Sequence, residues 1–262
     1  MTAGPTAVLH REKLRDARTQ LTRVAQAERD YLDGSPYRLV HRYDPRGGAY
    51  TIQAEIQHAL PAELPSLVAD MLASAAAGLD ALAAALASAP ADASSSPRFP
   101  IHDSLPVFAQ RSRRPLAAMP AEAQATIEAL QPYHTFGGFR NDVLWLLREL
   151  RGDGGARLAA GSLRDDSTLG VNTQRHVELA GDLHVVPGPF ERGDAIVSVP
   201  TRVTGPDPKL DLFLRPAWEL AFAASGPARG ASLLSTLGAI CDHVDRVVFI
   251  ALEPHLDAGP SS

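Results

Sequence analysis

The hydrophobic pattern of this chain changes near Ser162, and that change limits the folds open to it. Before this point apolar residues recur mainly at three- and four-residue spacing, which indicates amphipathic helices. After it come short runs rich in β-forming residues, separated by turn sequences such as Ala180-Gly181-Asp182. These runs are residues 175–179, 183–186, 195–203, 209–214 and 217–222. Because no long helices alternate with the runs, they favour an antiparallel sheet over a Rossmann fold or an α/β barrel.

Helices are expected before this change at residues 5–32, 64–89, 120–131 and 140–151. The first of them carries an apolar stripe of Leu14, Ala17, Leu21, Val24 and Tyr31. It ends at Gly34, which can take the left-handed conformation, and at Pro36, which cannot continue a helix. The second helix is the best patterned, and its many alanines allow another helix to approach closely.

Residues 37–43 and 49–56 are rich in β-forming residues and flank a glycine-containing loop, so a β-hairpin is expected at about residues 37–56. A last helix, at residues 231–252, has an apolar face wide enough to cover one side of the later sheet. The predicted fold is therefore α+β: a helical bundle with an inserted β-hairpin, followed by an antiparallel sheet and a C-terminal covering helix. The expected division is residues 1–160 and 161–262, which can share one core.

Two intervals are predicted to lack regular structure. Residues 89–97 have linker composition, and residues 99–119 contain several prolines. Arg111, Arg113 and Arg114 form the densest basic cluster and are interpreted as part of a solvated loop beside Pro115. With 25 Lys and Arg against 30 Asp and Glu, the net charge of −5 gives no overall electrostatic signature of nucleic-acid binding.

Cys241 is the single cysteine, which excludes an internal disulfide and a multi-thiolate zinc site. It lies in an apolar helical run and is interpreted as a small core residue. The N-terminus lacks the pattern of a secretory signal, and residues 64–89 carry Asp70 and Asp80, which favours a packed helix over a membrane span. A cytoplasmic location is expected.

The familiar catalytic motifs are missing from the sequence. It has no phosphate-binding glycine loop, no Gly-x-Ser-x-Gly and no histidine pair at zinc-ligand spacing, so neither a cofactor nor a metal is expected. Tyr133 and His134 precede Phe136-Gly137-Gly138-Phe139, where aromatic residues and glycines join two helices. This loop is a candidate for ligand contact, and equally for plugging the junction of the helices.

Several phrases of the first 160 residues resemble an uncharacterised actinobacterial protein family whose members have HEPN-like helical domains. The phrases are Ser35-Pro36-Tyr37-Arg38, the helix at residues 69–86, Phe99-Pro100-Ile101, Leu130-Gln131-Pro132-Tyr133 and Leu144-Trp145-Leu146-Leu147-Arg148-Glu149-Leu150. The resemblance spans roughly residues 10–160, and beyond it only the order of strands and a closing helix is similar.

The resemblance implies a set of polar residues between the helices, and most of that set is replaced here. Asp70, Leu72, Leu79, Asp80 and Leu82 keep the family pattern of the second helix. Family polar positions there are taken by Ala73, Ser74, Ala76 and Ala81. Glu149, Leu150 and Arg157 remain near the fourth helix, whereas Arg151, Gly155 and Ala156 replace Asn, Lys and His. The Arg-x4-6-His motif of HEPN-type nucleases is also missing. Alanine cannot transfer protons or hold a metal, so a degenerate, non-catalytic member is expected.

Three hypotheses about function follow. The first is a non-catalytic binding or assembly protein that uses its first helix to contact a partner or a second copy, unless the stripe of that helix packs on the second helix instead. The second is a small-ligand-binding protein or an enzyme with a site between bundle and sheet. Its candidate residues are Asp70, Asp80, Tyr133, His134, Glu149 and Arg157. The third is an RNA-associated HEPN-like protein, which the negative charge disfavours.

Overall fold

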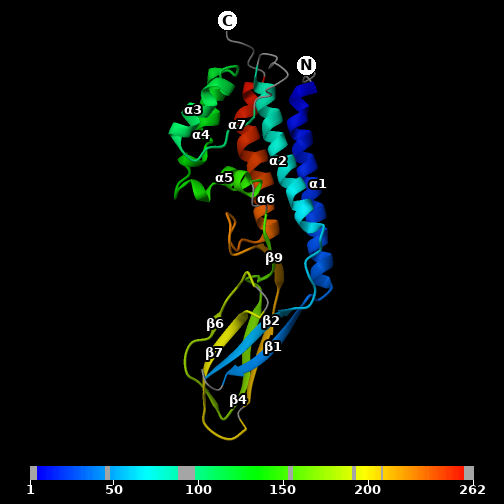
Figure 1. Ribbon diagram of the computed structural model, residues 1–262, viewed down its shortest axis with the longest axis vertical. Coiled ribbons are helices and arrows are strands. Elements are labelled where there is room, and N and C mark those ends of the chain that lie inside the picture. Colours follow the sequence, from blue (N-terminus) through cyan, green and yellow to red (C-terminus); the bar gives the residue numbers. More distant parts are fainter. Residues whose placement is uncertain are drawn as a thin grey trace. The chain divides into compact units, whose positions relative to one another are not determined.

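The computed structural model describes residues 5–44, 48–87, 98–152, 156–190, 193–207 and 209–256 (Figure 1). It confirms the α+β class, with a long first helix, a β-hairpin, further antiparallel strands and a C-terminal helix. Residues 89–97, expected to form a linker, and residues 45–47 at the hairpin turn lie outside the described ranges.

The chain divides into two compact units, each assembled from separate stretches. The helical unit comprises Met1–Ala25, Pro65–Ala156 and Leu234–Ser262, and the β unit comprises Gln26–Leu64 and Arg157–Leu233. These units differ from the expected segments 1–160 and 161–262. The hairpin belongs with the later strands because its second strand pairs with one of them, and the last helix belongs to the helical unit.

The helices are α1 (Pro5–Asp33), α2 (Leu64–Leu86), α3 (Leu105–Leu116), α4 (Ala121–Ala129), α5 (Val143–Leu150), α6 (Leu233–His243) and α7 (Ile250–Leu252). Apart from α3, they lie where hydrophobic periodicity predicted them, and the last turns of α1 belong to the β unit. A π-helical turn, η3 (Val244–Phe249), joins α6 to α7, and 3-10 turns lie at η1 (Pro132–His134), η2 (Phe139–Asn141) and η4 (Glu253–His255). The residues on the inward side of α1 recur alternately at four- and three-residue spacing. They are His10, Leu14, Ala17, Leu21, Val24, Glu28 and Tyr31.

Helix α2 is long and apolar enough to cross a membrane by length and composition alone. Half of its most apolar window is buried inside the protein, which a core helix also shows. Its buried side chains recur at helical spacing and include Val68, Met71, Leu79, Leu82 and Leu86.

Gly78 is the point of closest approach of three helical segments. A Cβ atom there would lie 3.2 Å from the carbonyl oxygen of His10 in α1 and 3.5 Å from Cζ of Phe249 in η3. A side chain at this position would therefore crowd the backbone of α1 and the ring of Phe249 where they pack on α2.

The prediction that residues 99–119 are irregular is wrong, because α3 occupies most of the second half of this interval. Pro106 lies in the first turn, where a missing N–H costs nothing, and Pro115 lies in the last turn. Arg111, Arg113 and Arg114 are therefore on an exposed helix face and not in a loop.

The β unit contains the predicted hairpin and two layers of antiparallel strands. Its strands are β1 (Tyr37–Asp44), β2 (Ala49–Ile56), β3 (Leu158–Leu163), β4 (Thr168–Arg175), β5 (Val177–Leu179), β6 (His184–Val185), β7 (Ala195–Val203), β8 (Lys209–Arg215) and β9 (Trp218–Phe222). The order β1-β2-β7-β5 forms one sheet, to which β6 adds by pairing with β7, while β3 pairs with β9 and β4 with β8.

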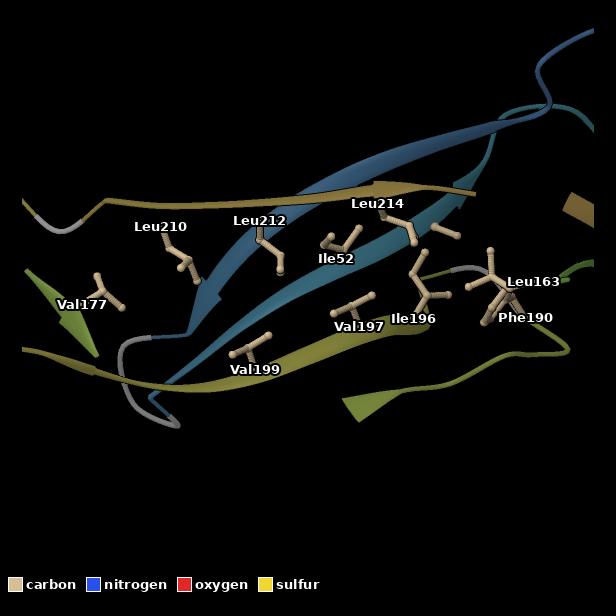
Figure 2. Packing of buried hydrophobic residues seen from close by; sticks show 11 residues of the cluster. Ile52, Leu163, Val177, Phe190, Ile196, Val197, Val199, Leu210, Leu212 and Leu214 are labelled. Carbon is tan, nitrogen blue, oxygen red and sulfur yellow. The ribbon is translucent and has the colours of Figure 1, made fainter. Parts of the chain in front are cut away.

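A single hydrophobic core lies between the sheet and the β4–β8 pair (Figure 2). Strand β8 contributes every second residue, Leu210, Leu212 and Leu214, while the residues between them face away from the core. Ile52 of β2 and Val199 of β7 face these leucines from the other layer. The arrangement is a small β-sandwich.

Strand β3 and most of β4 were not predicted. Strand β3 consists largely of small residues of low β propensity, and β4 contains Gly170 and Asn172, which are rare in strands. Each has a glycine across which an aromatic ring lies. Gly170 pairs directly with Phe213 on β8, and a Cβ atom on Gly161 would be 3.1 Å from the ring of Tyr37. Rings from neighbouring strands thus cover the backbone that the glycines leave bare.

Candidate functional site

Polar side chains of the helical unit hold one irregular segment, residues 99–103, and Asp80 is the one predicted site residue among them. Asp80 Oδ1 accepts a hydrogen bond from the N–H of Phe99 (2.9 Å). Arg148 donates to the carbonyl oxygen of Ile101 (3.1 Å) and forms an ion pair with Asp103 (3.3 Å). These contacts satisfy backbone groups that regular secondary structure leaves without partners here.

Gln131 completes the support of this segment and was not among the predicted site residues. It is 1% exposed, and its amide donates to the carbonyl oxygens of Pro100 (2.9 Å) and Ile127 (3.0 Å). Its Oε1 accepts from the N–H of His102 (2.9 Å). All its hydrogen-bonding capacity toward the chain is used for structure.

The other predicted residues lie in different surroundings. Tyr133 is half-buried, with its ring against those of Phe108 and His134, and Glu149 is exposed and paired with Arg148. Asp70 and His134 are exposed. Arg157 is exposed in the β unit, where its carbonyl oxygen accepts from the N–H of Ala223. Of the six predicted residues, Asp80 holds the segment 99–103, and the rings of Tyr133 and His134 contact each other.

His102 and Ser112 form the nearest approach to a catalytic pair. Nε2 of His102 lies 3.0 Å from Oγ of Ser112. Burial, and then the positive charges of Arg148 and Arg111, lower the pKa of His102, so the neutral ring is favoured near pH 7. Ser112 is 2% exposed, which leaves a substrate no access to its oxygen. We interpret the pair as a structural hydrogen bond.

Replacement of Gln131 by Leu is expected to lower the free energy of unfolding of the helical unit by about 2 kcal/mol, since it leaves the N–H of His102 and the oxygen of Pro100 buried without partners. Gln124→Leu is the control, because half-buried Gln124 makes one such bond, to the oxygen of Met119. Urea unfolding followed by Trp145 fluorescence measures both. Equal losses in the two variants would contradict the role assigned to Gln131.

Two buried polar residues interrupt the inward side of α1, one in each unit. In the helical unit His10 is 1% exposed and its Nε2–H donates to Oε1 of Glu253 (2.9 Å), while its ring meets Phe249 edge-on at 4.8 Å between centroids. Burial would raise the pKa of Glu253, but hydrogen bonds from Arg11 and His10 outweigh burial and lower it.

In the β unit the buried polar residue of α1 is Glu28, which is 4% exposed. Its Oε1 accepts from the N–H of Leu220 (2.7 Å), whereas its Oε2 and the hydroxyl of Tyr37 have no hydrogen-bond partner within the described residues. Burial raises the pKa of Glu28 and outweighs the opposing hydrogen bond from Leu220. The same cause raises the pKa of Tyr37.

The β-sandwich contains a small cavity of about 90 Å³ between its layers. It is lined by Tyr43 of β1, Tyr50 of β2, Val177 of β5, Thr201 of β7 and Leu210 of β8. The wall is mainly apolar. The Thr201 hydroxyl is already engaged, since it donates to the carbonyl oxygen of Gly48.

Strand register shows why this end of the core is open. Tyr43 pairs with Tyr50, Leu179 with Thr201 and Val203 with Val177, so each pair shares one face of the sheet, the face that carries the cavity wall. Tyr43, Leu179 and Val203 are nevertheless 40%, 44% and 41% exposed. The inward face of the sheet therefore continues past the cavity as an apolar rim in contact with water.

Tyr50 connects the cavity to polar neighbours. Burial, and then the negative charge of Asp211, raise the pKa of Tyr50, so its hydroxyl stays protonated at neutral pH. This hydroxyl lies 3.5 Å from Nδ1 of His41. The site thus offers an apolar wall with neutral hydroxyl groups, which suits an uncharged ligand with a small polar group or none.

The described part of the chain offers little support for a metal site or a reactive thiol. No three His, Cys, Asp or Glu side chains converge there as a possible metal site. Burial raises the pKa of Cys241 to about 11, so the thiol is protonated at neutral pH and behaves as the core residue that was predicted.

Comparison with protein-family models, with curated proteins and with solved structures finds no match for this chain. What the chain does is therefore argued from its own geometry.

Proposed function

We propose that this protein is a non-catalytic binding protein whose β unit accepts a small apolar group in the sandwich cavity. The observation that carries the proposal is the cavity of about 90 Å³ with its exposed apolar rim. An apolar cavity of comparable scale, about 150 Å³, is known to stay dry and to bind benzene. The wall residues can contact a ligand and exclude water from it. This fits ligand binding and not catalysis.

The size of the cavity limits the ligand to roughly one aromatic ring or a short branched chain. Drug-sized ligands occupy pockets of about 300 Å³ or more, so a larger molecule would enter only with one end. The exposed rim of Tyr43, Leu179 and Val203 would then contact the part that remains outside. A protruding side chain of another protein meets both conditions.

The apolar stripe of α1, considered above as an assembly surface, is not the basis of this proposal. Leu14, Ala17 and Val24 are buried within the helical unit itself. The binding surface proposed here lies on the inward face of the β1-β2-β7-β5 sheet.

Toluene is the probe that tests the cavity, because it has the size of one aromatic side chain. We expect binding with a dissociation constant of about 1 mM, equivalent to about −4 kcal/mol, and a rise in melting temperature at several millimolar toluene. Val177→Phe is expected to abolish binding, since the added ring occupies the cavity. Heteronuclear NMR of the backbone amides near Thr201 measures the affinity directly.

The matched control is Val185→Phe, the same substitution at a 39% exposed position on β6 that does not line the cavity. It is expected to leave toluene affinity unchanged. Absence of toluene binding to the unsubstituted chain, or equal binding by both variants, would refute a ligand site in this cavity.

A further inference from the structure

We propose that the cavity of the β unit receives Phe136 from a second copy of this chain, so that copies associate through this contact. This inference rests on the proposed function and names the occupant of the same cavity. It joins two features of the chain that are otherwise unexplained: a small apolar cavity with an open rim, and an aromatic side chain held wholly in water.

Phe136 is the most exposed of the large hydrophobic side chains in the described ranges, at 101%. Single exposed hydrophobic residues are common on proteins and need no explanation by themselves. Phe136 differs because its ring contributes nothing to the packing of its own helical unit. A phenylalanine in water loses the free energy that burial of its ring would provide.

The loop that presents Phe136 is tightly built. The hydroxyl of Thr135 donates to Oδ2 of Asp142 (2.6 Å), and Oδ1 of Asp142 accepts from the N–H groups of Leu144 and Trp145 at the start of α5. The side-chain amide of Asn141 donates to the carbonyl oxygen of Gly137 (3.1 Å). The residues on both sides of Phe136 are therefore tied to Asn141 and to Asp142, the N-cap of α5.

Glycines complete this geometry. Gly137 and Gly138 have φ angles of 83° and 101°, which side chains rarely permit. A Cβ atom on Gly137 would also lie 2.9 Å from the amide nitrogen of Asn141. A preorganised loop loses little conformational entropy on binding, which favours its use as an anchor.

The cavity matches this anchor in size and chemistry. Its volume of about 90 Å³ suits one phenyl ring, and Tyr43 and Tyr50 offer aromatic faces to it. The rim residues Leu179 and Val203 would surround the inserted side chain and exclude water from it. A second copy of the chain is a suitable partner because every copy carries Phe136.

Each molecule offers one anchor and one cavity. Two copies can exchange anchors reciprocally in a closed dimer, or copies can add one after another. In both cases we expect the mean mass of the full-length protein to rise with concentration in sedimentation velocity. Toluene is expected to reverse this rise by occupying the cavity.

Two variants test the anchor and the cavity separately. Phe136→Ala removes the anchor and Val177→Phe fills the cavity, and each is expected to lower the association constant at least tenfold. An equimolar mixture of the two variants is expected to form heterodimers only, since the Phe136→Ala chain keeps the cavity and the Val177→Phe chain keeps the anchor. Leu105→Ala, at a 51% exposed position of α3, is the control and should associate like the unsubstituted chain.

The outcomes distinguish this inference from the proposed function. If the full chain is monomeric at millimolar concentration while Phe136→Ala protein binds toluene, the inference is overturned and the cavity remains a ligand site. Association that persists in Phe136→Ala or in Val177→Phe also overturns it. If neither toluene binding nor association occurs, both the proposed function and the inference fail.

Discussion

Glu28→Ala is expected to lower the free energy of unfolding of the β unit by about 2 kcal/mol, whereas Glu28→Gln is expected to leave it unchanged or raised at pH 7. Alanine removes the acceptor of the Leu220 N–H and leaves that group buried without a partner. Glutamine keeps the acceptor and removes the cost of placing a carboxylate at a position that is 4% exposed.

The two tryptophans provide a reporter for each unit. Trp218 lies on β9 with its ring 4.4 Å from that of Tyr37, and Trp145 lies on α5. In a Trp145→Phe background, urea unfolding followed by fluorescence reports the β unit, and a Trp218→Phe background reports the helical unit. Glu28→Ala should shift the Trp218 transition more than the Trp145 transition. A loss of stability in Glu28→Gln as large as in Glu28→Ala would show that the hydrogen bond to Leu220 is not the cause.

The raised pKa of Glu28 also predicts how stability depends on pH. Between the ordinary pKa of a glutamate and the raised pKa in the fold, the folded state binds more protons than the unfolded state. Stability of the Glu28 protein relative to Glu28→Gln should therefore rise as pH falls through this window, and level off below it. The difference in unfolding free energy, measured by urea titration between about pH 4 and pH 8, tests this. If the free energy of unfolding of the Glu28 protein instead rose relative to that of Glu28→Gln with rising pH, a raised pKa would be contradicted.

Elements of this fold could be predicted from the sequence where the local hydrophobic pattern alone specifies them. Elements that depend on contacts with distant residues were missed. Helix α2 and the β1–β2 hairpin have strong periodicity and suitable end signals, and both were predicted with nearly correct bounds. Strand β4 was largely missed because its backbone at Gly170 is covered by Phe213, a residue that lies far along the chain. Helix α3 was missed because its prolines were counted without regard to their position in the turn.

The candidate site was harder to predict than the fold. The cavity is lined by residues of five strands, and none is unusual for a strand, so no local motif marks them. Phe136 was noticed among aromatic residues and glycines, but its full exposure follows only from the loop geometry. His10 and Glu28 did carry a signal, since both fall in register with the apolar residues of α1. Polar residues at such positions indicate buried contacts that need partners.

His10 fixes α1 to the C-terminal end of the chain, 243 residues away, and its loss should be the costliest of these changes. His10→Ala is expected to lower the free energy of unfolding of the helical unit by about 3 kcal/mol. The substitution removes a ring that is 1% exposed, takes away its edge-on contact with Phe249 and opens a cavity beside Phe249. Trp145 fluorescence in the Trp218→Phe background measures the change.

Arg11→Ala is the matched control for this prediction, because Arg11 is adjacent in sequence and binds the same carboxylate, Oε2 of Glu253 at 2.6 Å. The Arg11 side chain is 49% exposed, so its ion pair is screened by water and should be worth about 0.5 kcal/mol. A large loss in His10→Ala with a small loss in Arg11→Ala assigns the stability to buried packing and register. Equal losses would instead assign the stability to the charge of Glu253. Combining Glu253→Gln with each variant would then show no further loss from either substitution.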